Sequence, residues 1–134
     1  MQPISDAAAE TGFNQLLGVR LKGLEGNHYV IELDVTEQHL HRAGRVHGGI
    51  YLSLLDIVMA RASRASLDEN SFMPTLQINA NFLASASGGC ITGRGRVISR
   101  TKRTCYVEGE LSDQNGRLLA RGSATMIAVD IPSN

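Results

Sequence analysis

One carboxylate lies inside an apolar segment of this sequence. In "RVHGGIYLSLLDIVMARAS", residues 45–63, nine of the eleven residues from 50 to 60 are apolar, and the exceptions are Ser53 and Asp56. An ionised carboxylate without a partner in such surroundings costs several kcal/mol. No Lys or Arg lies three or four residues from Asp56, which excludes an ion pair within one helix. Asp56 therefore has a structural hydrogen bond elsewhere, faces water, or belongs to an active site, where perturbed carboxylates are enriched.

A pair of glycines precedes this carboxylate and points to carbonyl chemistry. A helix beginning near Gly48 would present its first free N–H groups outward, with the positive end of the helix dipole behind them. Gly48 and Gly49 lack side chains, so a ligand oxygen could approach that backbone closely. Such a terminus can stabilise an oxyanion by roughly 3–4 kcal/mol per well-placed donor.

The spacing between the two features predicts a shared site. Asp56 follows Gly48 by eight residues, roughly 12 Å along a helix axis at about 1.5 Å per residue. One helix therefore cannot readily bring both groups to the same carbonyl. The helix of a neighbouring subunit, packed antiparallel, could place its aspartate beside the first subunit's helix start.

The elements that must position these residues form an α+β pattern. The unbroken segment 49–66 is too long for a strand and predicts a helix that is buried on most sides. A short helix is expected within 6–17, capped by Ser5 or Asp6. Alternating patterns predict strands at 19–26, 28–36, 75–83, 90–99, 104–113 and 118–129. Short turns between successive strands imply an antiparallel sheet with the long helix across one face.

Composition narrows the functional class. A chain of 134 residues with 43% hydrophobic residues predicts one folded domain, 1–134. Thirteen basic residues balance thirteen acidic ones, so nothing indicates nucleic acid or an anionic membrane as partner. Cys90 and Cys105 are expected to be free thiols. The N-terminus has no signal-peptide pattern and the longest apolar run is too short to span a bilayer, so we expect a cytoplasmic protein.

The segment 44–60, "GRVHGGIYLSLLDIVMA", resembles the signature of the hotdog-fold thioesterases, in particular the phenylacetyl-CoA and 4-hydroxybenzoyl-CoA thioesterase-like group. In that group G-x-x-H-G-G opens the central helix, and an acidic residue follows eight positions after the first glycine of the pair. The resemblance covers residues 12–129. It implies a curved antiparallel sheet of about six strands around one long helix, and homodimers joined edge to edge that often pair into tetramers. It also implies active sites between subunits that hydrolyse acyl-CoA without metal or cofactor.

The resemblance also assigns roles to single residues. The backbone N–H of Gly48 would polarise the thioester carbonyl, and His47 would help to orient it. Asp56 of the partner subunit would be either the nucleophile or the general base for water. Thr75 matches a hydroxyl position that holds the water or the carboxylate. His41 stands where many relatives have an asparagine, so its imidazole would have to replace an amide.

Substrate contacts are expected from two further groups. The residues that would line the acyl pocket or allow the ligand to approach the helix are Gly49, Leu52, Met59 and Ala60. The basic run 99–103 contains Arg100, Lys102 and Arg103, which could bind the phosphates of coenzyme A or could simply form a solvated turn.

Other functions fit the sequence less well. His39, His41 and His47 could suggest a metal site, but no cysteine or carboxylate completes the ligand set at a usual spacing. A serine triad lacks the G-x-S-x-G elbow. A hydratase of the same fold would need an aspartate shortly before a histidine at the helix entry, which neither Asp34 nor Asp56 supplies. The main alternative is a non-catalytic module of the same fold that binds acyl-CoA.

Overall fold

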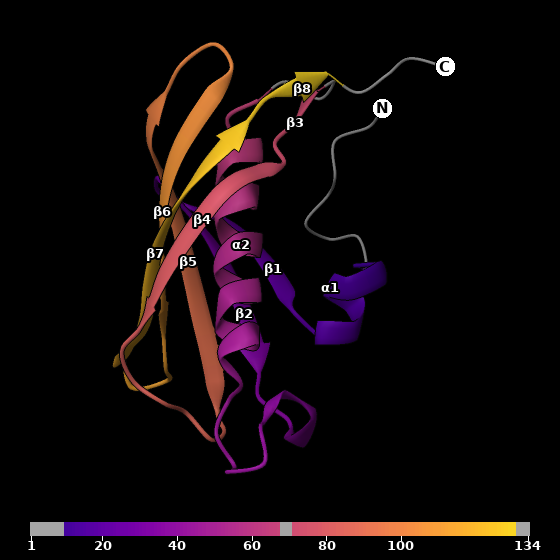
Figure 1. Ribbon diagram of the computed structural model, residues 1–134, viewed down its shortest axis with the longest axis vertical. Helices are drawn as coiled ribbons and strands as arrows, with labels where there is room; N and C mark the ends of the chain where they lie inside the picture. The colour runs from indigo at the N-terminus through magenta and orange to yellow at the C-terminus, as the bar shows by residue number, and fades with distance from the viewer. Residues whose placement is uncertain (1–9, 68–70, 131–134) are drawn as a thin grey trace.

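The computed structural model describes residues 10–67 and 71–130 (Figure 1). The elements, in chain order, are α1 (Gly12–Leu17), β1 (Arg20–Glu25), β2 (His28–Asp34), the 3-10 turn η1 (Glu37–His39), α2 (Gly48–Arg64), β3 (Ser71–Phe72), β4 (Thr75–Phe82), β5 (Cys90–Arg100), β6 (Thr104–Ser112), β7 (Leu118–Ile127) and β8 (Val129–Asp130). None of the helices in this part of the chain is both long and apolar enough to cross a membrane.

Six strands form one antiparallel sheet in the order β1-β2-β5-β6-β7-β4. The sheet curves around α2, which lies along its inner face, while α1 lies on the far side of β1 (Figure 1). The expected hotdog architecture, a curved antiparallel sheet around one long helix with a short N-terminal helix, is confirmed. The order also shows that β4 does not pair with β5, its neighbour in sequence. It crosses to β7 and becomes an edge of the sheet.

Several boundaries differ from the sequence prediction. The N-terminal helix begins at Gly12, so the expected helix over residues 10 and 11 is wrong, and the proposed caps Ser5 and Asp6 lie outside the described residues. The long helix ends at Arg64 rather than at 66, and its predicted stop signal at 68–70 is also outside the described part. The last strand is interrupted at Ala128, beyond which β8 pairs with β3. Neither this small pair nor η1 was predicted.

Two glycines let α2 lie close to the sheet. A Cβ atom on Gly95 of β5 would lie only 2.6 Å from the Val58 carbonyl oxygen, and one on Gly109 of β6 would lie 2.9 Å from Cγ of Met59. Side chains at these positions would therefore push the helix away from the strands. The close contact fixes the distance of α2 from the sheet, and with it the position of every group that the helix carries.

One stripe of α2 remains uncovered within the chain. The helix buries Leu54, Leu55 and Val58 completely, in agreement with the predicted burial on most sides. Residues spaced by three or four positions along the opposite stripe are exposed or half-buried, namely Gly49, Leu52, Ser53, Asp56 and Ala60. The edge strand β4 likewise exposes Leu76 at 64% and Phe82 at 51%. An uncovered helix stripe and an exposed edge strand are surfaces that a second chain could cover.

Candidate active site

The start of α2 is built by His47, Gly48 and Gly49. His47 is the N-cap residue, and its Nδ1 accepts a hydrogen bond of 2.9 Å from the Gly49 amide. Because Nδ1 is an acceptor, a neutral imidazole must carry its proton on Nε2. His47 is exposed, so this second nitrogen is available to a ligand.

The Gly48 amide is a free donor at this helix terminus. Within the residues that the structure describes, it makes no hydrogen bond. A Cβ atom on Gly48 would lie 3.0 Å from the ring of Phe82, so glycine allows the phenyl ring to rest against the backbone. A half-buried N–H group at a helix N-terminus is suited to a developing negative charge on oxygen.

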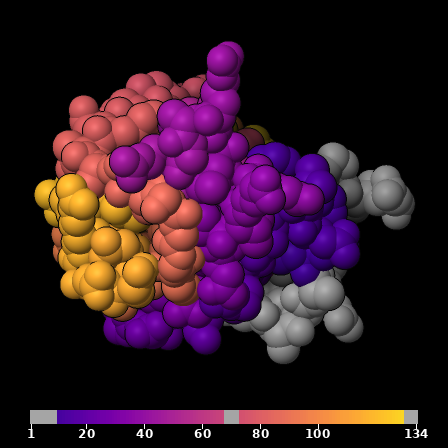
Figure 2. Space-filling view, turned by 90° about the horizontal axis from the view of Figure 1, so that it is seen from below, coloured from indigo at the N-terminus to yellow at the C-terminus, as the bar shows by residue number. Residues whose placement is uncertain are grey.

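A pocket of about 350 Å³ opens beside this terminus. Its lining residues are His41, Arg45, Val46, Gly48, Tyr51, Phe82, Leu83, Ala84 and Ser85. The space-filling view from below shows the segments near residues 45 and 85 meeting at this end of the molecule (Figure 2). His41 and Gly48, which the sequence predicted to act together, therefore lie in one pocket. The sequence did not predict the contributions of Arg45, Tyr51 and Phe82.

Tyr51 and Phe82 give the pocket a fixed aromatic wall. Their rings meet edge to face with centroids 5.8 Å apart, and the Tyr51 hydroxyl donates to the Ala84 carbonyl oxygen at 3.0 Å. Burial raises the pKa of Tyr51 above its usual value, so the hydroxyl stays protonated and can keep this bond. Tyr51 lies three residues after Gly48, one helical turn away, and this spacing is the signal that could have identified it.

Asp56 and Thr75 form the second cluster. The Thr75 hydroxyl, at the first residue of β4, donates to Oδ1 of Asp56 at 2.5 Å. The Thr75 oxygen also lies 3.3 Å from Sδ of Met126. A short bond to a carboxylate is charge-assisted, and it fixes the orientation of the group while leaving the other oxygen of Asp56 available. The structure thus joins the two residues that the sequence linked only through the resemblance.

These two clusters are separated within one chain. Asp56 is two helical turns beyond Gly48, and neither Asp56 nor Thr75 lines the pocket at the helix start. Strand β4 connects the clusters, since Thr75 at its first position bonds to Asp56 and Phe82 at its last position packs against Gly48. One chain therefore holds the two clusters at opposite ends of its edge strand.

The residues predicted to contact the acyl group or coenzyme A differ in burial and in their place in the fold. Gly49 and Leu52 are exposed and Ala60 is half-buried, whereas Met59 has no exposed surface and packs against Gly109 in the core. The residues of the basic turn between β5 and β6 are exposed. Arg100, the last residue of β5 before that turn, donates to the Ser66 hydroxyl at 2.6 Å, just beyond the C-terminal end of α2. The basic turn is thus at the C-terminal end of the helix, away from Gly48 (Figure 1).

Neither cysteine lies in surroundings that would activate its thiol as a nucleophile. Burial raises the pKa of the Cys90 thiol, and nearby carboxylates raise it further. Cys105 is completely buried. His39 is also buried, and both of its ring nitrogens are engaged in hydrogen bonds to backbone groups.

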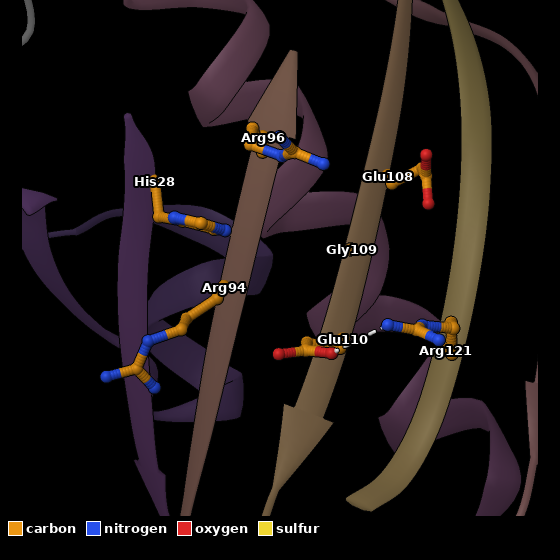
Figure 3. Close-up of a pocket in the computed structure, with 7 residues that line it drawn as sticks. All are labelled: His28, Arg94, Arg96, Glu108, Gly109, Glu110 and Arg121. Atoms are coloured by element: carbon orange, nitrogen blue, oxygen red, sulfur yellow. Dashed lines mark hydrogen bonds and ion pairs between the residues drawn. The ribbon is translucent and has the colours of Figure 1, made fainter. Parts of the chain in front are cut away.

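A smaller pocket of about 130 Å³ lies on the other face of the sheet, away from α2 (Figure 3). It is lined by His28, Arg94, Arg96, Glu108, Gly109, Glu110 and Arg121. Arg121 and Glu110 form an exposed ion pair at 3.3 Å, and exposed pairs contribute little to stability. This pocket contains none of the residues that the sequence predicted for catalysis, so it is separate from both clusters.

Comparisons with known proteins agree with this geometry. A family model described as "Thioesterase superfamily" matches residues 43–120. The chain is 28% identical over 115 residues to the 1,4-dihydroxy-2-naphthoyl-CoA hydrolase of Listeria monocytogenes, covering 86% of this chain and 94% of that one. A solved structure of a phenylacetic acid degradation-related protein from Ralstonia eutropha is 32% identical, with a TM-score of 0.79 and coverage of 85% and 87%. A Haemophilus influenzae thioesterase structure has a TM-score of 0.85 at 19% identity, covering 90% and 85%.

Proposed function

The chain belongs to the thioesterase superfamily and is a thioester hydrolase, and on that premise we propose that two copies share active sites that cleave acyl-CoA to free acid and coenzyme A. One observation carries this proposal: β4 connects a free oxyanion donor at one end to an oriented carboxylate at the other. Neither cluster alone has both a group to polarise the carbonyl and a group to deliver the nucleophile.

Antiparallel pairing of β4 with β4 of a second copy would complete both sites. Because β4 is an edge strand, one side of its backbone is free to pair. A two-fold axis near the middle of β4 would bring the Thr75 end of one copy beside the Phe82 end of the other. Asp56 of one chain would then approach Gly48 of its partner, twice in the dimer. The uncovered stripe of α2 beside Asp56 supports the same arrangement, since a partner would cover it.

In this proposal the carbonyl oxygen of the thioester binds at the start of α2. The Gly48 N–H donates to it, and the donation strengthens as the oxygen becomes an oxyanion. The His47 ring supplies a second donor through Nε2, because Nδ1 is engaged with the Gly49 amide. Both donors are held by the helix terminus and need no reorganisation during the reaction.

Asp56 of the partner subunit has two possible roles in this arrangement. As general base it takes a proton from water, whose oxygen adds to the carbonyl carbon; the C–S bond then breaks and the thiolate recovers the proton. As nucleophile its free oxygen displaces the thiolate to form a mixed anhydride that water hydrolyses. The Thr75 hydroxyl orients the carboxylate in either case. Neither route requires a metal or a cofactor.

The remaining substrate would occupy the surfaces around this centre. The acyl group enters the pocket beside Tyr51 and Phe82, whose aromatic wall suits an aryl or other apolar group. The phosphates of coenzyme A bind the basic turn that contains Arg100, Lys102 and Arg103. In the proposed dimer that turn of one copy lies at the same end as Gly48 of the other.

Thiol release from a panel of acyl-CoAs tests the assignment. Aryl-CoAs come first, because the names of two relatives mention 1,4-dihydroxy-2-naphthoyl-CoA and phenylacetic acid degradation. Fatty acyl-CoAs follow. We expect turnover by the wild type and its loss in Asp56→Asn, which keeps an oxygen that can accept the Thr75 bond and should remain folded. Unchanged turnover in a folded Asp56→Asn variant would refute the role of Asp56.

A further inference from the structure

We propose that His39 is a positioning residue: its buried ring fixes the segment that leads into α2 and thereby places the Gly48 donor. Its effect on catalysis rests on the proposed function, whereas its effect on the backbone does not. His39 is 7% exposed and lies at the end of η1, nine residues before Gly48. It touches no part of the pocket and acts only through the backbone.

The hydrogen bonds of the ring define a single neutral form. Nε2 lies 2.8 Å from the Leu17 carbonyl oxygen, which can only accept, so Nε2 must carry the proton. Nδ1 lies 2.9 Å from the Thr36 amide nitrogen, which can only donate, so Nδ1 must carry a lone pair. The buried imidazole therefore has one tautomer that satisfies both partners, and the ring joins the end of α1 to the start of η1.

The backbone of His39 transmits this anchoring to the helix start. Its carbonyl oxygen accepts from the His47 amide at 2.9 Å, and Leu40 forms a β-bridge with Val46. The His41 amide closes the same loop by donating to the Arg45 carbonyl oxygen at 2.8 Å. His47 is the N-cap of α2, so the base of the loop is one residue from Gly48.

The two hydrogen bonds of the His39 ring connect it to residues at different distances along the sequence. The bond to Thr36 is local, because it spans only three residues within η1. The bond to Leu17 spans 22 residues and connects the loop to a buried point at the end of α1. We therefore expect the Leu17 bond to set the position of the loop, while the Thr36 bond mainly stabilises the turn.

Two conservative variants separate these bonds. In His39→Gln the side-chain amide N–H can reach Leu17, but the acceptor for Thr36 is lost. In His39→Asn the side-chain oxygen replaces Nδ1 as acceptor for Thr36, but Leu17 is out of reach. We expect His39→Gln to keep kcat within about threefold of the wild type, and His39→Asn to lose roughly 10- to 100-fold with a smaller change in KM, as expected for a displaced transition-state donor.

A structural control and an activity-independent measurement complete the test. Ile31→Val removes one methylene from the core under α2 and should lower stability without changing kcat. Hydrogen exchange of the His47 amide should be faster in His39→Asn than in His39→Gln or the wild type. Equal exchange in both variants, or a kcat in His39→Asn no lower than in His39→Gln, would overturn the proposal. If the wild type releases no thiol from any acyl-CoA, the proposed function fails, and hydrogen exchange alone still decides the role of His39.

Discussion

Gly48→Pro removes the proposed oxyanion donor while leaving the helix start intact. Proline has no N–H, and it is well tolerated at the first helical position, where the N–H has no partner within the helix. The preceding residue, His47, has φ −62° and ψ 138°, which is the conformation that a following proline favours. Gly48→Ala is the matched control, because it adds the same Cβ against the ring of Phe82 and keeps the N–H.

The expected difference between the two variants follows from this geometry. Both variants add the same Cβ, which would lie 3.0 Å from the ring of Phe82, so this contact is matched between them. Only proline deletes the donor, so kcat of Gly48→Pro should be about 10²- to 10³-fold below that of Gly48→Ala, or roughly 3–4 kcal/mol. The Gly48 amide makes no hydrogen bond within the described residues. The two variants should therefore have free energies of unfolding within about 0.5 kcal/mol of each other.

Thiol release at saturating acyl-CoA measures kcat for both variants, and thermal unfolding checks that each is folded. If Gly48→Pro and Gly48→Ala turn over at the same rate, the Gly48 N–H is not the oxyanion donor. A large fall in both variants alike would instead attribute the effect to Phe82 and would equally contradict the role of the amide.

Mixing experiments then test the shared site. Gly48→Pro and Asp56→Asn homodimers should each be nearly inactive. Random exchange of subunits in a 1:1 mixture makes about half of the dimers mixed. Each mixed dimer has one intact site of its two. About a quarter of the wild-type activity should therefore return. No recovery after verified subunit exchange would show that Gly48 and Asp56 do not act across a dimer interface.

Substitutions at three more residues test the supporting contacts. Thr75→Val should lower kcat by roughly tenfold because the Asp56 carboxylate loses its orienting bond, and Thr75→Ser should restore most of the activity. Tyr51→Phe should lose about 1 kcal/mol of unfolding free energy with its bond to Ala84. Burial raises the pKa of Tyr51 in the folded state, so above about pH 10 the unfolded chain releases a proton that the folded chain retains. The wild type should therefore lose stability in this pH range. Urea titrations of the phenylalanine variant should lack this decline. Gly95→Ala should destabilise by about 1–3 kcal/mol in thermal unfolding, since its methyl group would press on the α2 backbone.

The fold was predictable where periodicity is strong. The alternation of Tyr29, Ile31 and Leu33 identified a strand with one face on the helix, and all three are buried. The length of the apolar segment identified α2. The pairing of β4 with β7 was not predictable, because strand order depends on long-range contacts that local pattern does not encode. The β3–β8 pair was missed for a related reason, since two-residue strands have no period.

The site was predictable only in part. The position of Gly48 at the helix start followed from the glycine pair, and the structure confirms that α2 begins there. The distance from Gly48 to Asp56 followed from helical rise alone. The bond between Asp56 and Thr75 joins residues 19 positions apart, and periodicity carries no information about such a contact. The same holds for Phe82, which reaches Gly48 only because β4 crosses to the edge of the sheet.

The resemblance leads us to expect an asparagine at the position of His41, where this chain has an imidazole. Its Nδ1 accepts from the Ala43 amide at 3.0 Å, so the neutral ring carries its proton on Nε2. Its centroid lies 6.5 Å from that of the His47 ring, and it lines the same pocket as Gly48. The ring therefore retains one N–H donor among the residues that line the pocket, as the side-chain amide of an asparagine would.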